Sequence, residues 1–157
     1  MTLLITPRVG VLVRVLLLAP AIGLSGLFAT PASAAPKSMT IALSGADEVP
    51  PVQTAGKGTA VLSFDPETRV LSWTLEFSDL SGPATMAHFH GPAMAGKNAP
   101  VVLWMVKKGE TPISPTKGEA VLTEDQAKAF TDGEWYINVH TPDNPPGEIR
   151  GLIPAVQ

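Results

Sequence analysis

The chain has 157 residues, with 11 basic and 14 acidic side chains and no cysteine, so its net charge is −3. The lack of cysteine excludes disulfides and thiolate metal ligands. The acidic balance, without a basic cluster, argues against nucleic acid as a partner.

Residues 1–34 are typical of a secretory signal peptide. Arg8 and Arg14 accompany a long apolar run that ends in the small-residue pattern Pro31-Ala32-Ser33-Ala34, and we expect cleavage after Ala34. A membrane anchor is the alternative, because the run is long and Arg14 comes late, but the proline and glycines within the run favour removal. No later segment is apolar enough to span a membrane. We therefore expect an exported protein, periplasmic or secreted, with one domain over residues 35–157.

The mature chain predicts a succession of short strands. Alternating apolar and polar residues mark strands over 39–44, 58–64 and 70–77, and the second and third form a hairpin across the turn at 65–68. Further strands are expected around His88 and His90 and over 101–106, 120–122, 135–140 and 148–153.

One helix is predicted, running to about Phe130. Thr123 is its N-cap and Gln126, three residues later, completes a capping box, while Asp132-Gly133 ends it. About seven to eight short strands with one short helix predict an all-β fold. We expect a Greek-key antiparallel sandwich or a flattened barrel.

All three histidines of the chain lie in two of these strands. Side chains alternate along a strand, so His88 and His90 share one face and Phe89 takes the other. By the same count His140 lies opposite the apolar face of its own strand, which carries Trp135, Ile137 and Val139. If the two strands are close, three imidazoles converge outside the core, on the outer face of the sheet. This pattern predicts a mononuclear metal site, and three ordinary hydrogen-bonded histidines are the alternative.

Copper is the favoured ion and zinc the alternative. Imidazole binds both, and copper has the higher intrinsic affinity. Met86 shares the face of the histidine pair, and its thioether is a soft ligand suited to Cu(I); filling a gap in the packing is its alternative role. Tyr136 and Asn138, on the face of His140, are expected to support the ligands or to anchor loops.

Two charged segments have both a functional and an ordinary interpretation. Glu148 and Arg150 share a strand face and form either a surface ion pair or part of the site. In the second case Arg150 attracts an anion to the metal, and Glu148 holds a histidine Nδ1–H. The acidic pair Asp47-Glu48 binds a cation, supports a loop or is solvated in a turn.

At these residues the sequence resembles the CHRD domain family, named for its occurrence in chordin and widespread in exported bacterial proteins. The resemblance covers almost the whole mature chain and implies an all-β domain without a settled activity. It is carried by Leu43-Ser44-Gly45-Ala46-Asp47-Glu48-Val49-Pro50-Pro51, Ala87-His88-Phe89-His90-Gly91-Pro92, Tyr136-Ile137-Asn138-Val139-His140-Thr141 and Pro146-Gly147-Glu148-Ile149-Arg150-Gly151.

The sequence also resembles, more weakly, the copper/zinc superoxide dismutases. These enzymes have a His-x-His strand, a later strand ending in a copper-binding histidine, and a following arginine that guides the anion. The resemblance implies copper ligands at His88, His90 and His140 and an anion-guiding role for Arg150. The bridging histidine, the further zinc ligands and the disulfide cysteines are missing, which excludes a binuclear site.

The expected function is therefore an exported copper-binding β-domain. Its three-histidine site either reacts with superoxide or another small anion in the manner of a dismutase, or stores and delivers copper. The alternative is a non-catalytic protein-interaction module outside the cytoplasm, with structural histidines.

Overall fold

Eight strands form one antiparallel sheet in the computed structural model, which describes residues 10, 35–94 and 96–156. The predicted signal peptide, apart from Gly10, lies outside the described residues. The order across the sheet is β5-β4-β7-β8-β1-β2-β3-β6. The strands are β1 (Lys37–Ser44), β2 (Lys57–Asp65), β3 (Val70–Ser78), β4 (Met86–His90), β5 (Val101–Trp104), β6 (Thr116–Val121), β7 (Tyr136–His140) and β8 (Ile149–Leu152).

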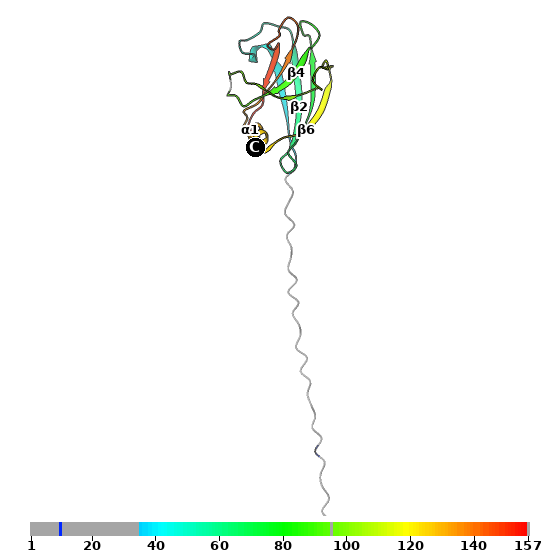
Figure 1. The fold of residues 1–157 in the computed structure, drawn as a ribbon, viewed down its shortest axis with the longest axis vertical. Coiled ribbons are helices and arrows are strands. Elements are labelled where there is room, and N and C mark those ends of the chain that lie inside the picture. The colour runs from blue at the N-terminus through cyan, green and yellow to red at the C-terminus, as the bar shows by residue number, and fades with distance from the viewer. Residues whose placement is uncertain (1–9, 11–34, 95, 157) are drawn as a thin grey trace, which may run out of the picture. The chain divides into compact units, whose positions relative to one another are not determined.

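The sheet curls so that its two halves face each other (Figure 1). One residue pair, Ser44 with Arg150, joins β1 to β8 at the point where the halves meet. Across the interior, the ring of Trp73 in β3 meets that of Phe89 in β4 edge-on, with centroids 5.3 Å apart. Trp73 also donates its indole N–H to the carbonyl of Met105 at 3.2 Å. The predicted all-β class, a sandwich or flattened barrel with one helix, is confirmed.

The core lies between these two halves, as the alternation of apolar residues predicts. Inward positions of every strand except the edge strands β5 and β6 contribute buried apolar residues to it, and burial of these side chains is the main stabilising contribution. The largest fully buried apolar side chains are Trp135, Phe64, Phe89, Phe130, Leu43, Leu62, Leu71, Leu75, Met105, Leu122 and Ile137.

Helix α1 (Glu124–Thr131) lies between β6 and β7 in the chain and begins as predicted. The Thr123 hydroxyl accepts the N–H of Gln126 at 3.2 Å, and the Gln126 side chain accepts the N–H of Thr123 at 3.0 Å. Phe130 anchors the helix to the core, with ring centroids 5.1 Å from Phe64 and 5.6 Å from Trp135. A short 3₁₀ turn, η1 (Gly45–Asp47), follows β1.

Two predicted strand boundaries were wrong. The strand expected over 101–106 ends at Trp104, because Met105 turns inward and donates its N–H to the carbonyl of Ala87. The strand expected at 120–122 begins earlier, at Thr116, and includes Gly118. Gly118 lacks strand propensity, but a Cβ there would lie 2.5 Å from the Trp73 ring, so only glycine fits at this position.

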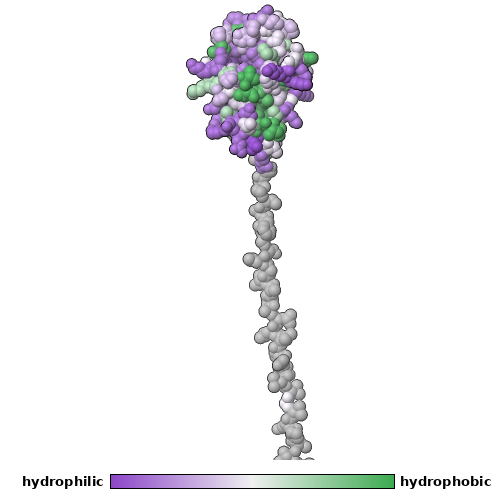
Figure 2. All heavy atoms as spheres, viewed as in Figure 1, coloured by the Kyte–Doolittle hydropathy of each residue, from purple (hydrophilic) through white to green (hydrophobic). Residues whose placement is uncertain are grey.

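Polar side chains cover most of the visible face of the domain, with an apolar patch near its centre (Figure 2). Among the residues that the structure describes, no helix is long and apolar enough to cross a membrane.

Candidate metal centre

Strands β4 and β7 are neighbours in the sheet and bring the three histidines together. Their antiparallel register places Met86 opposite His140, His88 opposite Asn138 and His90 opposite Tyr136. The other face of the same strands is fully buried core, formed by Ala87, Phe89, Ile137 and Val139. The predicted division of faces is therefore confirmed.

One ring nitrogen from each of His88, His90 and His140 lies within 4.8 Å of the other two. The closest approach is 3.1 Å, between Nδ1 of His88 and Nε2 of His140. Among the described residues, these three side chains form a group that could hold a metal ion. The structure thus contains a histidine cluster that fits the donor set of a mononuclear site.

The histidines lie outside the core, as expected, but they are not on a solvent-facing surface. Only 3%, 8% and 6% of His88, His90 and His140 is exposed. Trp104 of the edge strand packs edge-on against His88, with centroids 4.2 Å apart. The ring of Tyr136 stacks parallel on His90 at 4.7 Å. The expected outer-face site is therefore corrected to a covered one, enclosed by aromatic rings and loops.

Backbone carbonyls fix the tautomers of two of the rings. Nδ1 of His90 lies 2.8 Å from the carbonyl oxygen of Ala99, and Nδ1 of His140 lies 2.8 Å from that of Pro145. A carbonyl oxygen can only accept, so both Nδ1 atoms carry hydrogen and both Nε2 atoms present lone pairs. His88 must then donate its Nδ1–H to Nε2 of His140, which leaves its own Nε2 with a lone pair and no partner.

Burial keeps these imidazoles neutral. It lowers the pKa of His88 to about 4, assisted by repulsion from protonated His140 and His90. Burial also lowers the pKa of His90 and that of His140, although the hydrogen bonds to Ala99 and Pro145 act in the opposite direction. Neutral imidazole is the form that binds metal, so no proton has to leave a ring before an ion binds at neutral pH.

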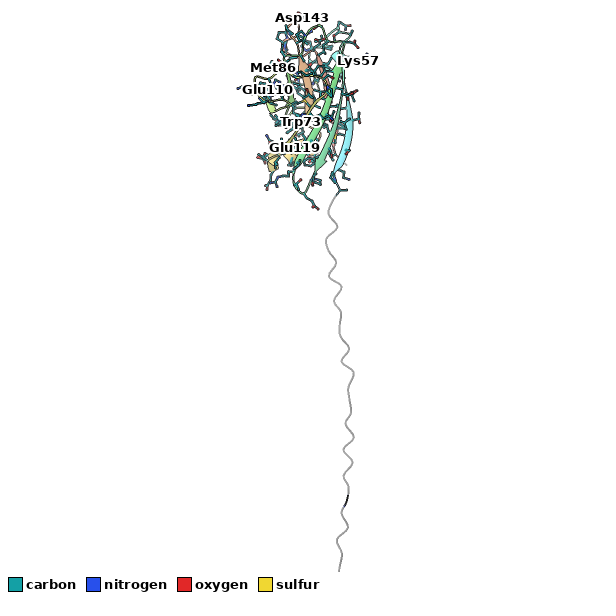
Figure 3. The ribbon with its side chains drawn as sticks, turned by 90° about the vertical axis from the view of Figure 1, so that its right-hand side faces the viewer. Lys57, Trp73, Met86, Glu110, Glu119 and Asp143 are labelled. Carbon is teal, nitrogen blue, oxygen red and sulfur yellow. The ribbon has the colours of Figure 1, made fainter. Side chains whose placement is uncertain are left out.

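Met86 and Arg150 lie at the edges of the cluster. Met86 is half-buried opposite His140, toward the end of the domain that carries Asp143 (Figure 3). Arg150 is completely buried, and its guanidinium lies 3.4 Å from the centre of the Tyr136 ring. Its role in attracting an anion and the role of Met86 as a ligand stay predictions.

Arg150 holds a loop over the histidines. Its terminal nitrogens donate to the carbonyl of Lys97 at 2.7 Å and to Oδ1 of Asn98 at 3.0 Å. The next residue, Ala99, supplies the carbonyl that orients His90, and its N–H donates to the Tyr136 hydroxyl at 3.1 Å. Arg150 therefore fixes the loop whose Ala99 carbonyl orients His90.

Glu148 does not hold a histidine, and it is not a surface residue. Its carboxylate accepts hydrogen bonds from Thr54, from the backbone and hydroxyl of Ser81, and from Thr141. Burial alone would raise the pKa of Glu148, but these hydrogen bonds outweigh it and lower the pKa to about 2. Glu148 thus joins three segments of the chain beside the strand end that carries His140.

Sequence reasoning missed the two carbonyls that orient the rings. Ala99 and Pro145 both precede a proline, at Pro100 and Pro146. A residue before proline is restricted to extended conformations, which fixes the direction of its backbone. These two X-Pro pairs are the only sign of the carbonyls in the sequence.

The model of the CHRD domain matches residues 39–153, which is well over half of the chain. This range includes the three histidines, both orienting carbonyls and Arg150. Neither the comparison with curated proteins nor that with solved structures found a match.

Proposed function

The chain belongs to the CHRD domain family, and from this premise we propose that it is an exported domain that binds one metal ion through His88, His90 and His140. The observation that carries the proposal is the convergence of three buried, neutral imidazoles, each of which brings one ring nitrogen within 4.8 Å of the other two. Two nitrogens bound tetrahedrally to one ion at about 2.0–2.1 Å lie roughly 3.3 Å apart. The 3.1 Å between His88 Nδ1 and His140 Nε2 fits that spacing, provided that the hydrogen of His88 moves from Nδ1 to Nε2 and the ion takes its place between the two nitrogens.

Copper is the proposed ion and zinc the alternative. The donor set contains only neutral nitrogen and, with Met86, a thioether, and these ligands suit copper in either oxidation state. A carboxylate-rich set, which favours magnesium or calcium, is absent from this cluster.

The test is metal content after loading and exhaustive dialysis, measured by mass spectrometry on the mature domain. Wild type should retain one copper per chain, and His88→Ala, His90→Ala and His140→Ala should each lose it. Met94→Ala is the matched control, because this methionine is 81% exposed and so reports adventitious binding to a thioether. Stoichiometric copper in all three histidine variants would refute the site.

We further propose that the bound copper is redox-active. Three imidazoles leave a coordination position open, and a small anion such as superoxide is the proposed substrate. Copper-loaded protein should dismutate superoxide faster than the same amount of free copper. Activity equal to that of free copper would leave copper storage or delivery as the function of the site.

Export to the periplasm or the medium is proposed from residues 1–34. The mature protein should begin at Ala35 when N-terminal sequencing is applied to material recovered outside the cytoplasm. An intact N-terminus in a membrane fraction would instead support the anchor interpretation.

A second candidate is a protein-interaction module, favoured by a hollow between the two edge strands. This hollow, of about 490 Å³, is lined by Trp104 of β5, Lys117 of β6 and Lys107 of the segment after β5, among others, and by none of the histidines. Unpaired strand edges can bind an extended segment of a partner. A binding partner that is retained by the histidine variants, with no metal in natively purified protein, would favour this candidate.

A further inference from the structure

Buried polar atoms without partners gather around the histidine centre. Among the described residues, the buried side-chain atoms that lack a hydrogen-bond partner are Glu48 Oε1, His88 Nε2, His90 Nε2, Asn138 Oδ1 and Arg150 Nε. Such atoms are rare in native proteins because leaving them unpaired is costly. Four of the five offer a lone pair, which is the chemistry that a cation requires.

Glu48 is the unexpected member of this group. Its side chain is only 6% exposed, whereas that of the neighbouring Asp47 is exposed. A Cβ at Gly147 would lie 2.3 Å from Glu48 Oε1 and 2.6 Å from Asn138 Nδ2. The bare glycine, at φ +140°, therefore makes room for the carboxylate beside the Asn138 amide.

Asn138 connects this carboxylate to the histidines. In the sheet it is paired with His88 of β4 on one side and with Arg150 of β8 on the other. Its side chain lowers the pKa of Glu48 and raises that of His90, so it is close to both. The lack of well-aligned hydrogen bonds at Asn138 Oδ1, His90 Nε2 and Glu48 Oε1 means that these contacts are incomplete.

The charges around the centre explain why a carboxylate belongs there. The three imidazoles are neutral, and the nearby Arg150 is buried with its terminal nitrogens bound to uncharged oxygens. An ion held by the histidines would add positive charge to a region that already contains this guanidinium. Glu48 follows η1 in the chain and supplies such a carboxylate, since its pKa is lowered by the charge of Arg150.

Resting on the proposed function, we propose that Glu48 is the counter-charge of the metal centre. Its carboxylate, placed by Gly147 and linked through Asn138, balances the positive charge of the ion and of Arg150. Glu48 is a positioning residue of the site and not a ligand, because the cluster of ligand atoms contains only the histidine nitrogens. Burial raises the pKa of Glu48 to about 7 even though Arg150 lowers it, as expected of a carboxylate that lacks its cation.

The test compares the affinity of wild type, Glu48→Gln and Asp47→Asn for Zn²⁺, which has one oxidation state. Dissociation constants are measured at pH 8 by competition with a chromogenic chelator. Glu48→Gln should bind at least about tenfold more weakly, the loss typical of residues that support metal ligands. Asp47→Asn removes an equal charge from an exposed neighbour and should bind as wild type does. A dissociation constant of Glu48→Gln that is unchanged from wild type would overturn the proposal.

The melting temperature of the metal-free proteins provides the second readout. Glu48→Gln should melt at the same temperature as wild type or higher, because without an ion the cost of burying this carboxylate outweighs its attraction to Arg150. A lower melting temperature together with weaker binding would show that Glu48 is structural and would also overturn the proposal. If wild type itself binds no zinc or copper, the proposed function fails and this inference fails with it, whereas equal binding by wild type and Glu48→Gln refutes this inference alone.

Discussion

His90 and His140 each use Nδ1 to hold their orientation and keep Nε2 for a ligand. The carbonyls of Ala99 and Pro145 orient His90 and His140, and His140 in turn orients His88. Rings fixed in this way lose little further freedom when an ion binds, which favours tight and specific binding.

The alternation of side chains in the sequence is sufficient to predict which face the histidines share. It contains no information on the loops, so it could not predict their burial.

Glu148 illustrates what sequence spacing cannot distinguish. Its position two residues before Arg150 is compatible with a surface ion pair, a histidine support or a buried anchor. The structure shows a buried anchor, because two of its donors, Thr54 and Ser81, come from distant parts of the chain. Contacts of such long sequence separation leave no local pattern.

A first prediction concerns the acid stability that Glu148 provides. Its pKa is about 2 in the folded state against 4.5 as the reference value, so its stabilisation is fully present above about pH 4.5 and is lost as pH falls toward 2. The size is on the order of 3 kcal/mol. Urea unfolding of metal-free Glu148→Gln should show lower stability than wild type at pH 7 and a small difference near pH 2.5. An equal difference at both pH values would contradict this explanation.

A second prediction separates the charge of Arg150 from its geometry. Arg150→Lys keeps the positive charge but loses the forked hydrogen bonds to Lys97 and Asn98 and the stacking on Tyr136. If Arg150 acts through the loop, both Arg150→Lys and Arg150→Ala release copper to a chelator about tenfold faster than wild type and lose dismutase activity. If attraction of the anion is its role, Arg150→Lys retains copper and activity, and Arg150→Ala loses only activity.

At the scale of elements, the centre depends on the pairing of β4 with β7. The sequence predicts both strands and the orientation of their side chains, because a period of two is a local signal. The pairing itself joins residues about fifty positions apart, with β5, β6 and α1 between them in the chain. No local pattern specifies that neighbourhood, so the sequence predicts convergence of the histidines only if the two strands are neighbours, and the sheet order shows that they are.

Helix α1 shows the opposite case, in which local chemistry determines the element. Its start depends on the reciprocal bonds between Thr123 and Gln126, and its end on Asp132 and Gly133, as predicted.

The third prediction follows from this capping box. Thr123→Ala should lower the free energy of unfolding by about 1 kcal/mol, because one helix N–H loses its partner. Its copper content should match wild type, since the buried residues of α1, Ala127 and Phe130, belong to the core and not to the histidine face. Denaturant unfolding and metal analysis of the same preparation check both parts. Loss of copper in this variant would mean that global destabilisation, and not ligand loss, empties the site.

At the scale of the whole molecule, one curled sheet performs two tasks with its two faces. The inner face packs the aromatic core across the two halves, and the outer face of β4 and β7 carries the histidines under a cover of loops. Composition and strand spacing are sufficient to predict the all-β class. The curl and the cover depend on long-range contacts such as Trp73 with Phe89 and Arg150 with Lys97, which the sequence does not reveal.

X-ray absorption spectroscopy of the copper-loaded mature domain tests the central claim most directly, because it counts the nitrogen ligands of the ion. We predict three imidazole nitrogens at about 2.0 Å in wild type. His88→Ala, His90→Ala and His140→Ala are given one equivalent of copper without dialysis, and their spectra should lose the three-imidazole signature. A wild-type spectrum with fewer than three imidazoles, or one unchanged by the histidine substitutions, would contradict a three-histidine metal centre.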